Sequence, residues 1–261
     1  MTLYSSHIPT SWFQKSLLTL GSGLGAFFNP TRDEFIATFG ETTSNQALVF
    51  MRRKMVEDPE GRRILRDRPL INSQTLSSSS LRHSPAESFG EAYLKFLETN
   101  GVSPDSRKRV QFVDDEELAY VMQRYREVHD LIHTLLGMKT NLLGEITVKW
   151  VEGLQFGLPM CVTAGVFGPV RLKPKHRQLY LRTYLPWAQE AGRTSRFLLN
   201  VYFEERWHQD LCQLRKELRI PDPPNSAATN PYDVSLLYRT DKSEISNTDF
   251  IFEAENRRIE N

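Results

Sequence analysis

The chain has 261 residues, of which 39% are hydrophobic and 25% charged, a composition typical of a globular protein that buries a sizeable core in one large domain or two small ones. Its 33 lysines and arginines nearly balance its 32 aspartates and glutamates, so no overall field would recruit nucleic acid, and we expect no nucleic-acid partner. The two cysteines, Cys161 and Cys212, lie far apart, which excludes a zinc ribbon and suits a reducing compartment.

Apolar residues in the first part of the chain mostly recur at spacings of three and four, the pattern of amphipathic helices. Thr10 or Ser11 can cap a first helix that ends near the Asn29-Pro30 pair. Further helices are predicted over 32–39, 44–57 and 87–100, and a short one begins at Asp58 and stops before Pro69. The serine-rich segment 72–88 predicts a connector.

The acidic run "DDEE" at 114–117 predicts the start of a long helix that runs to about Leu136, because carboxylates complement the positive end of a helix dipole. Gly137 is a natural residue to follow the helix, and Asn141 is a plausible N-cap for the next one. Two more helices are predicted over 175–190 and 194–218. We therefore predict an all-α fold with a single helical domain over residues 1–224, followed by a flexible tail over 225–261, which is polar and weakly periodic.

The longest uncharged stretch is "GLQFGLPMCVTAGVFGPV", residues 153–170, which Pro159, Pro169 and four glycines interrupt. It is too broken for a transmembrane helix. Buried core is the preferred interpretation, and a segment that faces lipid or a lipid-like ligand is the alternative. The first 32 residues contain no acid but only Lys15 and Arg32 as strong cations, too few for a convincing mitochondrial presequence, so the residues alone assign no compartment.

The segment "YREVHDLIHTLLGMKTNLLGEITVKW", residues 125–150, contains the strongest candidate site. His129 and His133 are four residues apart, so on a helix their imidazoles can reach one point. An antiparallel helical hairpin would set Glu145 opposite them, since His133 precedes the Gly137 stop by one turn and Glu145 follows the Asn141 cap by one turn. Asp130 points elsewhere on the helix, and it would either ligate an ion between the faces or orient a histidine.

Two imidazoles with one or two carboxylates suit zinc with an open position and equally an iron(II) site of two histidines and one carboxylate. From the residues alone, a pair of capped or surface histidines remains the competing interpretation. Nucleophilic and nucleotide chemistry have little support, because the chain has no G-x-S-x-G elbow, no Walker sequence and no dinucleotide glycine fingerprint.

The flanking stretches "FVDDEELAYVMQRYREVHDLIHTLLG" and "LLGEITVKWVEGLQFGLPMC" resemble the mitochondrial ubiquinone (coenzyme Q) biosynthesis protein 4 family, as do "HIPTS", "NPTRDEF", "GETT", "DPEGRRIL" and "YFEERW". The resemblance covers roughly residues 5–223 and none of the tail. It implies a divalent metal, usually taken as zinc, on His129, Asp130, His133 and Glu145. The family's presequence is not recognisable here.

The resemblance also implies a protein peripheral to the matrix side of the mitochondrial inner membrane that organises the ubiquinone-synthesising complex. Its implied partners are the other enzymes of that complex, polyprenylated quinone precursors and membrane lipid, and a homo-oligomer is left open. The implied activity is decarboxylation at ring carbon 1 of a polyprenylated hydroxybenzoate, in some accounts coupled to hydroxylation, with Asp130 or Glu145 moving a proton. Zinc would fit a non-oxidative reaction and iron an oxidative one. The rival is a non-catalytic lipid-binding scaffold with a structural metal. Segments 11–28 and 153–170 are candidates for contact with the substrate's tail or with lipid.

Overall fold

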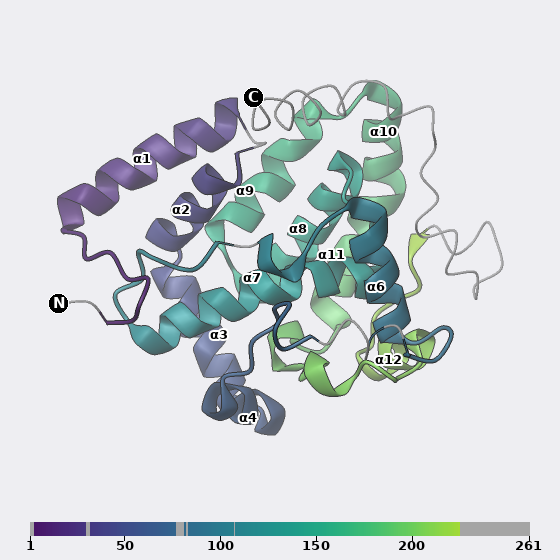
Figure 1. Cartoon of the computed structure of the whole chain (residues 1–261). Helices are drawn as coiled ribbons and strands as arrows, with labels where there is room; N and C mark the ends of the chain where they lie inside the picture. Colours follow the sequence, from purple (N-terminus) through teal and green to yellow (C-terminus); the bar gives the residue numbers. More distant parts are fainter. Residues whose placement is uncertain (1–2, 30–31, 77–80, 82, 107, 225–261) are drawn as a thin grey trace, which may run out of the picture.

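The three longest helices begin at residues whose side chains accept hydrogen bonds from the exposed amides of the first turn. Our structure is a computed structural model that describes residues 3–29, 32–76, 81, 83–106 and 108–224. Within these residues it is all-helical, and its single β-type pairing is an isolated bridge between Ser88 and Asp210. The helices are α1 (Trp12–Phe28), α2 (Asp33–Thr43), α3 (Asn45–Glu57), α4 (Pro59–Asp67), α6 (Phe89–Asn100), α7 (Glu116–Leu136), α8 (Leu142–Phe156), α9 (Pro159–Phe167), α10 (Pro174–Leu179), α11 (Leu185–Thr194) and α12 (Leu211–Glu217) (Figure 1).

Four helix starts follow the predicted capping signals. Ser11 and Gln14 form a capping box on α1, and Asp58 accepts two amide hydrogen bonds at the start of α4. Asp115 caps α7, and Asn141 caps α8. The predicted boundaries of these helices are therefore close to the observed ones, and the all-α single domain is confirmed. The predicted tail, 225–261, lies outside the described residues, so its boundary at 224 stays a prediction.

Helix α7 lies at the centre of the molecule (Figure 1) and contributes more buried apolar residues to the core than any other described helix. Its apolar side chains Val128, Leu131, Ile132 and Leu135 are fully buried. Helices α3, α6 and α8 pack around it. A helix that is buried on all sides forces any polar residue it carries to find a partner inside the protein. This constraint shapes the site described below.

The prediction of one helix over 194–218 is wrong. The structure has the short turns η4 (Leu198–Asn200) and η5 (Phe203–Glu205) there, and only α12 is α-helical. Backbone amides that would donate to carbonyl oxygens within a helix donate instead to side chains from other elements. The Gln155 side chain accepts from the Leu198 amide, and Glu60 accepts from the Tyr202 amide. These long-range bonds hold the segment in extended turns.

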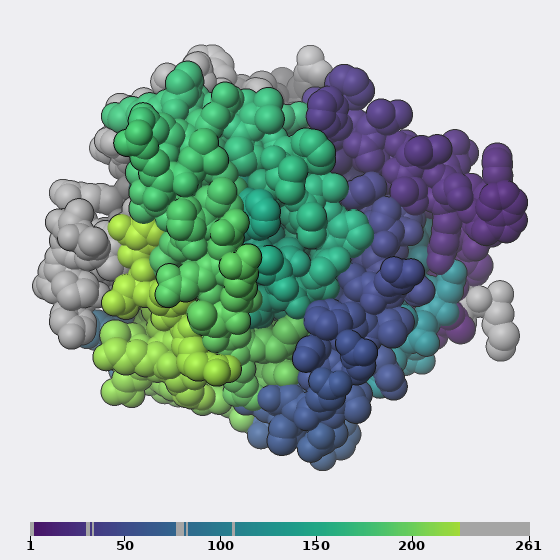
Figure 2. Space-filling view, turned by 180° about the vertical axis from the view of Figure 1, so that it is seen from behind, coloured from purple at the N-terminus to yellow at the C-terminus, as the bar shows by residue number. Residues whose placement is uncertain are grey.

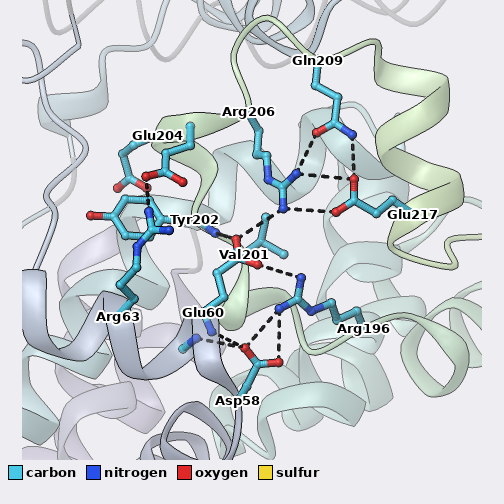
Figure 3. A network of polar contacts seen from close by, with 12 residues as sticks. Asp58, Glu60, Arg63, Arg196, Val201, Tyr202, Glu204, Arg206, Gln209 and Glu217 are labelled. Atoms are coloured by element: carbon cyan, nitrogen blue, oxygen red, sulfur yellow. Dashed lines mark hydrogen bonds and ion pairs between the residues drawn. The ribbon is translucent and has the colours of Figure 1, made fainter.

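A network of ion pairs fastens this turn-rich segment to the start of α4 (Figure 3). Arg196 pairs with Asp58 at 3.1 Å and with Glu60 at 2.8 Å, while Arg206 reaches both Glu60 and Glu217. Both arginines thus have acidic partners within this network. We assign the network a structural role, because it fixes the C-terminal part of the domain against α4.

The uncharged stretch 153–170 is less buried than the preferred interpretation required. Phe156, Leu158 and Cys161 are core residues, but Val166, Phe167 and Val170 are exposed. The reason is that Pro159 and Gly168 break the stretch into the end of α8, α9 and the turn η2 (Gly168–Arg171), and that α9 and η2 each leave apolar side chains at the surface. In the described part of the chain, no helix combines the length and apolarity needed to cross a membrane.

Candidate metal centre

Helices α7 and α8 run antiparallel and face each other through polar side chains. Along α7, Tyr125, His129 and His133 follow one another at four-residue intervals, and along α8 Glu145 and Glu152 lie on the facing side. Tyr125 contacts Glu152, His129 contacts both carboxylates, and His133 contacts Glu145. Residues later in α7 thus contact residues earlier in α8, as the predicted antiparallel hairpin requires.

The connection between the two helices is tight, and it sets the position of Glu145. Gly137 ends α7 in the left-handed conformation with φ of 65°, as predicted. A Cβ atom on Gly144 would stand 2.0 Å from the Lys139 carbonyl oxygen, so only glycine lets the turn fold back this closely on the first turn of α8. This close approach holds Glu145 beside His133.

The two imidazoles are oriented by hydrogen-bond acceptors on their Nδ1 atoms. His133 Nδ1 lies 3.2 Å from the carbonyl oxygen of Met138, which can only accept, so Nδ1 carries the proton. His129 Nδ1 lies 2.6 Å from Oε1 of Glu152, which is fully buried. A backbone carbonyl and a carboxylate in these places are the usual partners of metal-ligating histidines. When the rings are neutral, both therefore present the lone pair of Nε2.

The two Nε2 atoms converge on the carboxylate of Glu145. His129 Nε2 lies 3.7 Å from Oε2 of Glu145, and His133 Nε2 lies 3.3 Å from its Oε1. The three ligand atoms are within 4.8 Å of one another. His133 Nε2 is buried and makes no hydrogen bond of normal geometry with the described residues. Three acceptors that face one point repel one another unless a proton or a metal ion lies between them, and two imidazoles with a carboxylate fit a divalent metal.

Three ionisable side chains of α8, those of Glu145, Lys149 and Glu152, are stabilised in their charged forms by their neighbours. Burial alone would raise the pKa of Glu145, but the facing His133 and His129, when protonated, hold it well below its usual range. Burial also opposes ionisation of Glu152, but His129 and Lys149 lower its pKa strongly. The pKa of Lys149 is raised despite its burial, because Glu152 stabilises the ammonium group. The result is a buried chain of alternating charge along α8.

Of the four predicted ligands, the structure brings together His129, His133 and Glu145. The Asp130 side chain is buried but is not among the groups that converge on one point. Its predicted roles, as a ligand or as a residue that moves a proton, stay predictions.

Sequence reasoning missed four residues that surround the histidines. Lys149 Nζ lies 2.8 Å from Glu152, 3.0 Å from the Tyr125 hydroxyl and 3.4 Å from His129 Nδ1. Cys161 contacts both Tyr125 and Glu152, and burial raises the pKa of its thiol to about 12, so it is no nucleophile. A signal for two of them was present, because Lys149 and Glu152 follow Glu145 at i+4 and i+7, on the same helix face.

Comparisons with known proteins decide the family. Residues 4–224 match the family model described as "Coenzyme Q (ubiquinone) biosynthesis protein Coq4". The chain belongs to the Coq4 family. Among its curated relatives are the mitochondrial COQ4 homologues of Bos taurus, 54% identical over 85% of this chain and 84% of the relative, and of Homo sapiens, 52% identical with the same coverage. The homologue of Bombyx mori is 50% identical over 84% of each chain.

A solved structure supports the fold. A candidate ubiquinone biosynthesis protein from Nostoc punctiforme superposes with a TM-score of 0.64 over 81% of this chain and 99% of the other, at 19% identity. At that identity the likeness concerns the fold alone. Membership of the Coq4 family gives the chain a role in ubiquinone biosynthesis and confirms the resemblance drawn from "HDLIH" and its flanking sequence.

Proposed function

We propose that this chain holds a divalent metal, zinc or alternatively iron, and catalyses decarboxylation at ring carbon 1 of a polyprenylated 4-hydroxybenzoate. The observation that carries the proposal is the fixed direction of two Nε2 lone pairs toward Glu145, since Nδ1 of each histidine is occupied by an acceptor. Two imidazoles and a carboxylate are the ligand set of many catalytic metal sites. Membership of the Coq4 family supplies the pathway.

In this proposal the metal contributes Lewis acidity that stabilises negative charge on the substrate. The bond between ring carbon 1 and the carboxyl carbon breaks, carbon dioxide leaves, and the electron pair remains on the ring carbon, which then takes up a proton. We assign the movement of that proton to Glu145 or Asp130. Lys149, with 16% of its side chain exposed, adds a positive charge beside His129. A version coupled to hydroxylation consumes dioxygen and a reductant and requires iron, because zinc has no redox chemistry.

We further propose that the protein acts at the matrix side of the mitochondrial inner membrane, as a peripheral protein. Its partners there are the other enzymes of the ubiquinone-synthesising complex, the polyprenylated precursors and lipid. Two observations support this location. The relatives are named mitochondrial, and a substrate with a long isoprenoid tail is too apolar to leave the bilayer, so the enzyme must reach the membrane surface.

The alternative is a scaffold of the same complex in which the metal only ties α7 to α8. A structural site closes its coordination shell with four protein ligands, whereas a catalytic site keeps a position open. Three residues converge here, and Glu145 leaves 35% of its side chain exposed. This arrangement favours the enzyme.

The test is complementation of cells that lack the protein, with His133→Ala, Glu145→Gln and Asp130→Asn compared with matched controls. His208→Ala and Glu98→Gln alter a histidine and a glutamate that are exposed and lie outside the cluster. We expect the site variants to accumulate the carboxylated precursor and the purified His133→Ala protein to lose its metal. Normal ubiquinone in all three site variants would exclude the catalytic proposal, and full metal content in His133→Ala would exclude the ligand assignment.

A further inference from the structure

Helix α1 is packed with its apolar side outward. The side chains of Phe13, Leu17, Leu20, Leu24 and Phe27 recur at alternating spacings of four and three, so they form one stripe along the helix. Every one of them is exposed, Leu20 to the extent of 67%. Water-soluble proteins place such a stripe against their core. In this helix it faces away from the rest of the protein.

The inner side of α1 consists mostly of small and polar residues, together with Leu18. Ser22 is the buried residue of the helix, and Lys15 reaches back to pair with Asp114. A Cβ atom on Gly25 would lie 2.7 Å from the ring of Phe35, so α1 contacts α2 at a distance that only glycine allows. Helix α1 is therefore firmly held on α2, with its orientation fixed by these contacts (Figure 1).

The exposed apolar surface continues from α1 onto the turn after α9. Arg171 in η2 donates a hydrogen bond to the Phe27 carbonyl and lies with its guanidinium over the Phe27 ring, which joins the two segments. Next to Arg171, Val170 is 71% exposed, and Phe167 is exposed as well. We call this surface the apolar platform: Trp12, Phe13, Leu17, Leu20, Leu24, Phe27, Phe28, Phe167 and Val170. In Figure 2 α1 forms the outer edge of the molecule, beyond α2.

The charged residues on the η2 and α10 side of the platform have one sign. Residues 1–32 and 153–189 contain no aspartate or glutamate, whereas 171–182 contain five lysines and arginines. Lys173, Lys175 and Arg182 are exposed and form no ion pair with the described residues. The platform thus has a cationic margin on its η2 and α10 side. Apolar side chains next to lysines and arginines are the composition of helices that lie in the interface of an anionic membrane.

We infer that the apolar platform inserts into the surface of an anionic phospholipid bilayer, with Lys173, Lys175 and Arg182 at its phosphate groups. The inference rests on the proposed function for the presence of a membrane, and it adds the docking face and the headgroup charge. Trp12 at one end of the stripe, where an indole is 80% exposed, suits the boundary between headgroups and acyl chains.

A second copy of the chain fits this face less well. Twofold pairing would bring together the cationic margins of both copies, and the segments 1–32 and 153–189 that carry the platform supply no acidic residue to neutralise them. A lipid surface avoids this cost, because its phosphates supply the opposite charge throughout the contact.

The experiment is vesicle flotation of the full-length protein, with phosphatidylcholine vesicles and with vesicles that also contain phosphatidylglycerol. Leu20→Gln/Leu24→Gln removes two apolar contacts, and its control, Val49→Gln/Val56→Gln, alters two exposed valines of α3. Lys173→Gln/Lys175→Gln removes two charges of the margin. Its control, Arg193→Gln/Lys216→Gln, removes two exposed charges from α11 and α12.

We expect the wild type to float best with anionic vesicles. The leucine variant should bind both kinds of vesicle about tenfold more weakly or worse, because each leucine buries less apolar surface as glutamine. The lysine variant should bind anionic vesicles about tenfold more weakly or worse, and its binding to phosphatidylcholine vesicles should not change. Both controls should bind like the wild type.

Three results would overturn the inference. These are a wild type that does not float, a leucine or lysine variant that floats as well as the wild type, and a control that loses as much vesicle binding as the variant it matches. A wild-type dimer that the leucine variant dissociates without a change in flotation would instead assign the platform to a second copy. Glu145→Gln separates this inference from the proposed function. If that variant makes normal ubiquinone but the platform variants lose flotation, only the catalytic proposal fails.

Discussion

Glu152→Gln tests whether a buried carboxylate makes His129 a metal ligand. Glu152 is fully buried, with Oε1 2.6 Å from His129 Nδ1 and Oε2 2.8 Å from Lys149 Nζ. The substitution keeps the size and shape of the side chain but removes its charge. An amide oxygen can still accept from Nδ1, so the ring keeps its place while its Nε2 becomes less basic.

The expected effect on metal binding follows from the behaviour of carboxylate and histidine pairs at metal sites. Loss of such a partner weakens metal binding about 10–100-fold, which corresponds to about 1.4–2.7 kcal/mol. The stability effect is separate, because Lys149 loses its counter-charge; removal of one partner of a buried ion pair costs about 3–5 kcal/mol. The double variant Glu152→Gln/Lys149→Met removes both charges and should recover much of that stability without recovering metal affinity.

The assay is competition for zinc between the purified protein and a chromogenic chelator, with thermal unfolding measured in parallel. Glu127→Gln is the matched control, since Glu127 is a buried carboxylate of α7 that accepts from the Ile71 amide and lies outside the metal centre. Zinc affinity of Glu152→Gln equal to that of the wild type would refute the reasoning, as would an equal loss of affinity in Glu127→Gln.

Three further predictions concern metal, the turn and pH. Protein saturated with metal, at a free metal concentration about a hundredfold above the dissociation constant, should lose about 2.7 kcal/mol of its free energy of unfolding when a chelator removes the metal. Calorimetry should then show a Tm lower by about 5–10 °C. Gly144→Ala should destabilise the domain by about 1–3 kcal/mol and weaken zinc binding, because its Cβ would meet the Lys139 carbonyl at 2.0 Å; Gly21→Ala, with no atom within 4 Å, should not destabilise it. Burial raises the pKa of Glu127 above 4.5, so the folded state binds the carboxyl proton more tightly than the unfolded state does. The wild type should therefore lose stability relative to Glu127→Gln as the pH rises from 4.5 through the raised pKa, and denaturant titrations at several pH values measure this loss.

Helix starts and stops could be predicted from the sequence because their causes are local. Ser11, Asp58 and Asn141 each bond to amides within three residues, and Gly137 supplies the left-handed residue that ends α7. The facing of Glu145 and His133 was predictable for the same reason, since each lies one turn from a recognisable helix end.

The turns over 194–218 and the partners of the histidines depend on contacts between distant residues. Gln155 and Glu60 satisfy backbone groups more than 40 residues away in the chain, which no spacing rule indicates. The burial of Glu152 beside His129 likewise depends on how α7 and α8 are rotated, and helix periodicity gives only the face on which a residue lies. The outward stripe of α1 is the opposite case. Its period was visible, but the direction in which it faces is set by close contacts of glycines with α2.

The open side of the candidate metal centre lies at the N-terminal end of α8. Glu145 is 35% exposed there, whereas His133 is fully buried and His129 nearly so. The positive end of the α8 dipole favours negative charge at this place, both on Glu145 and on an approaching carboxylate. Gly168 of η2 packs against Ile146, the residue after Glu145, so η2 connects this end of α8 with the apolar platform. A precursor whose isoprenoid tail stays in the bilayer would then bring its ring carboxylate to the exposed side of the centre without passing through the core around α7.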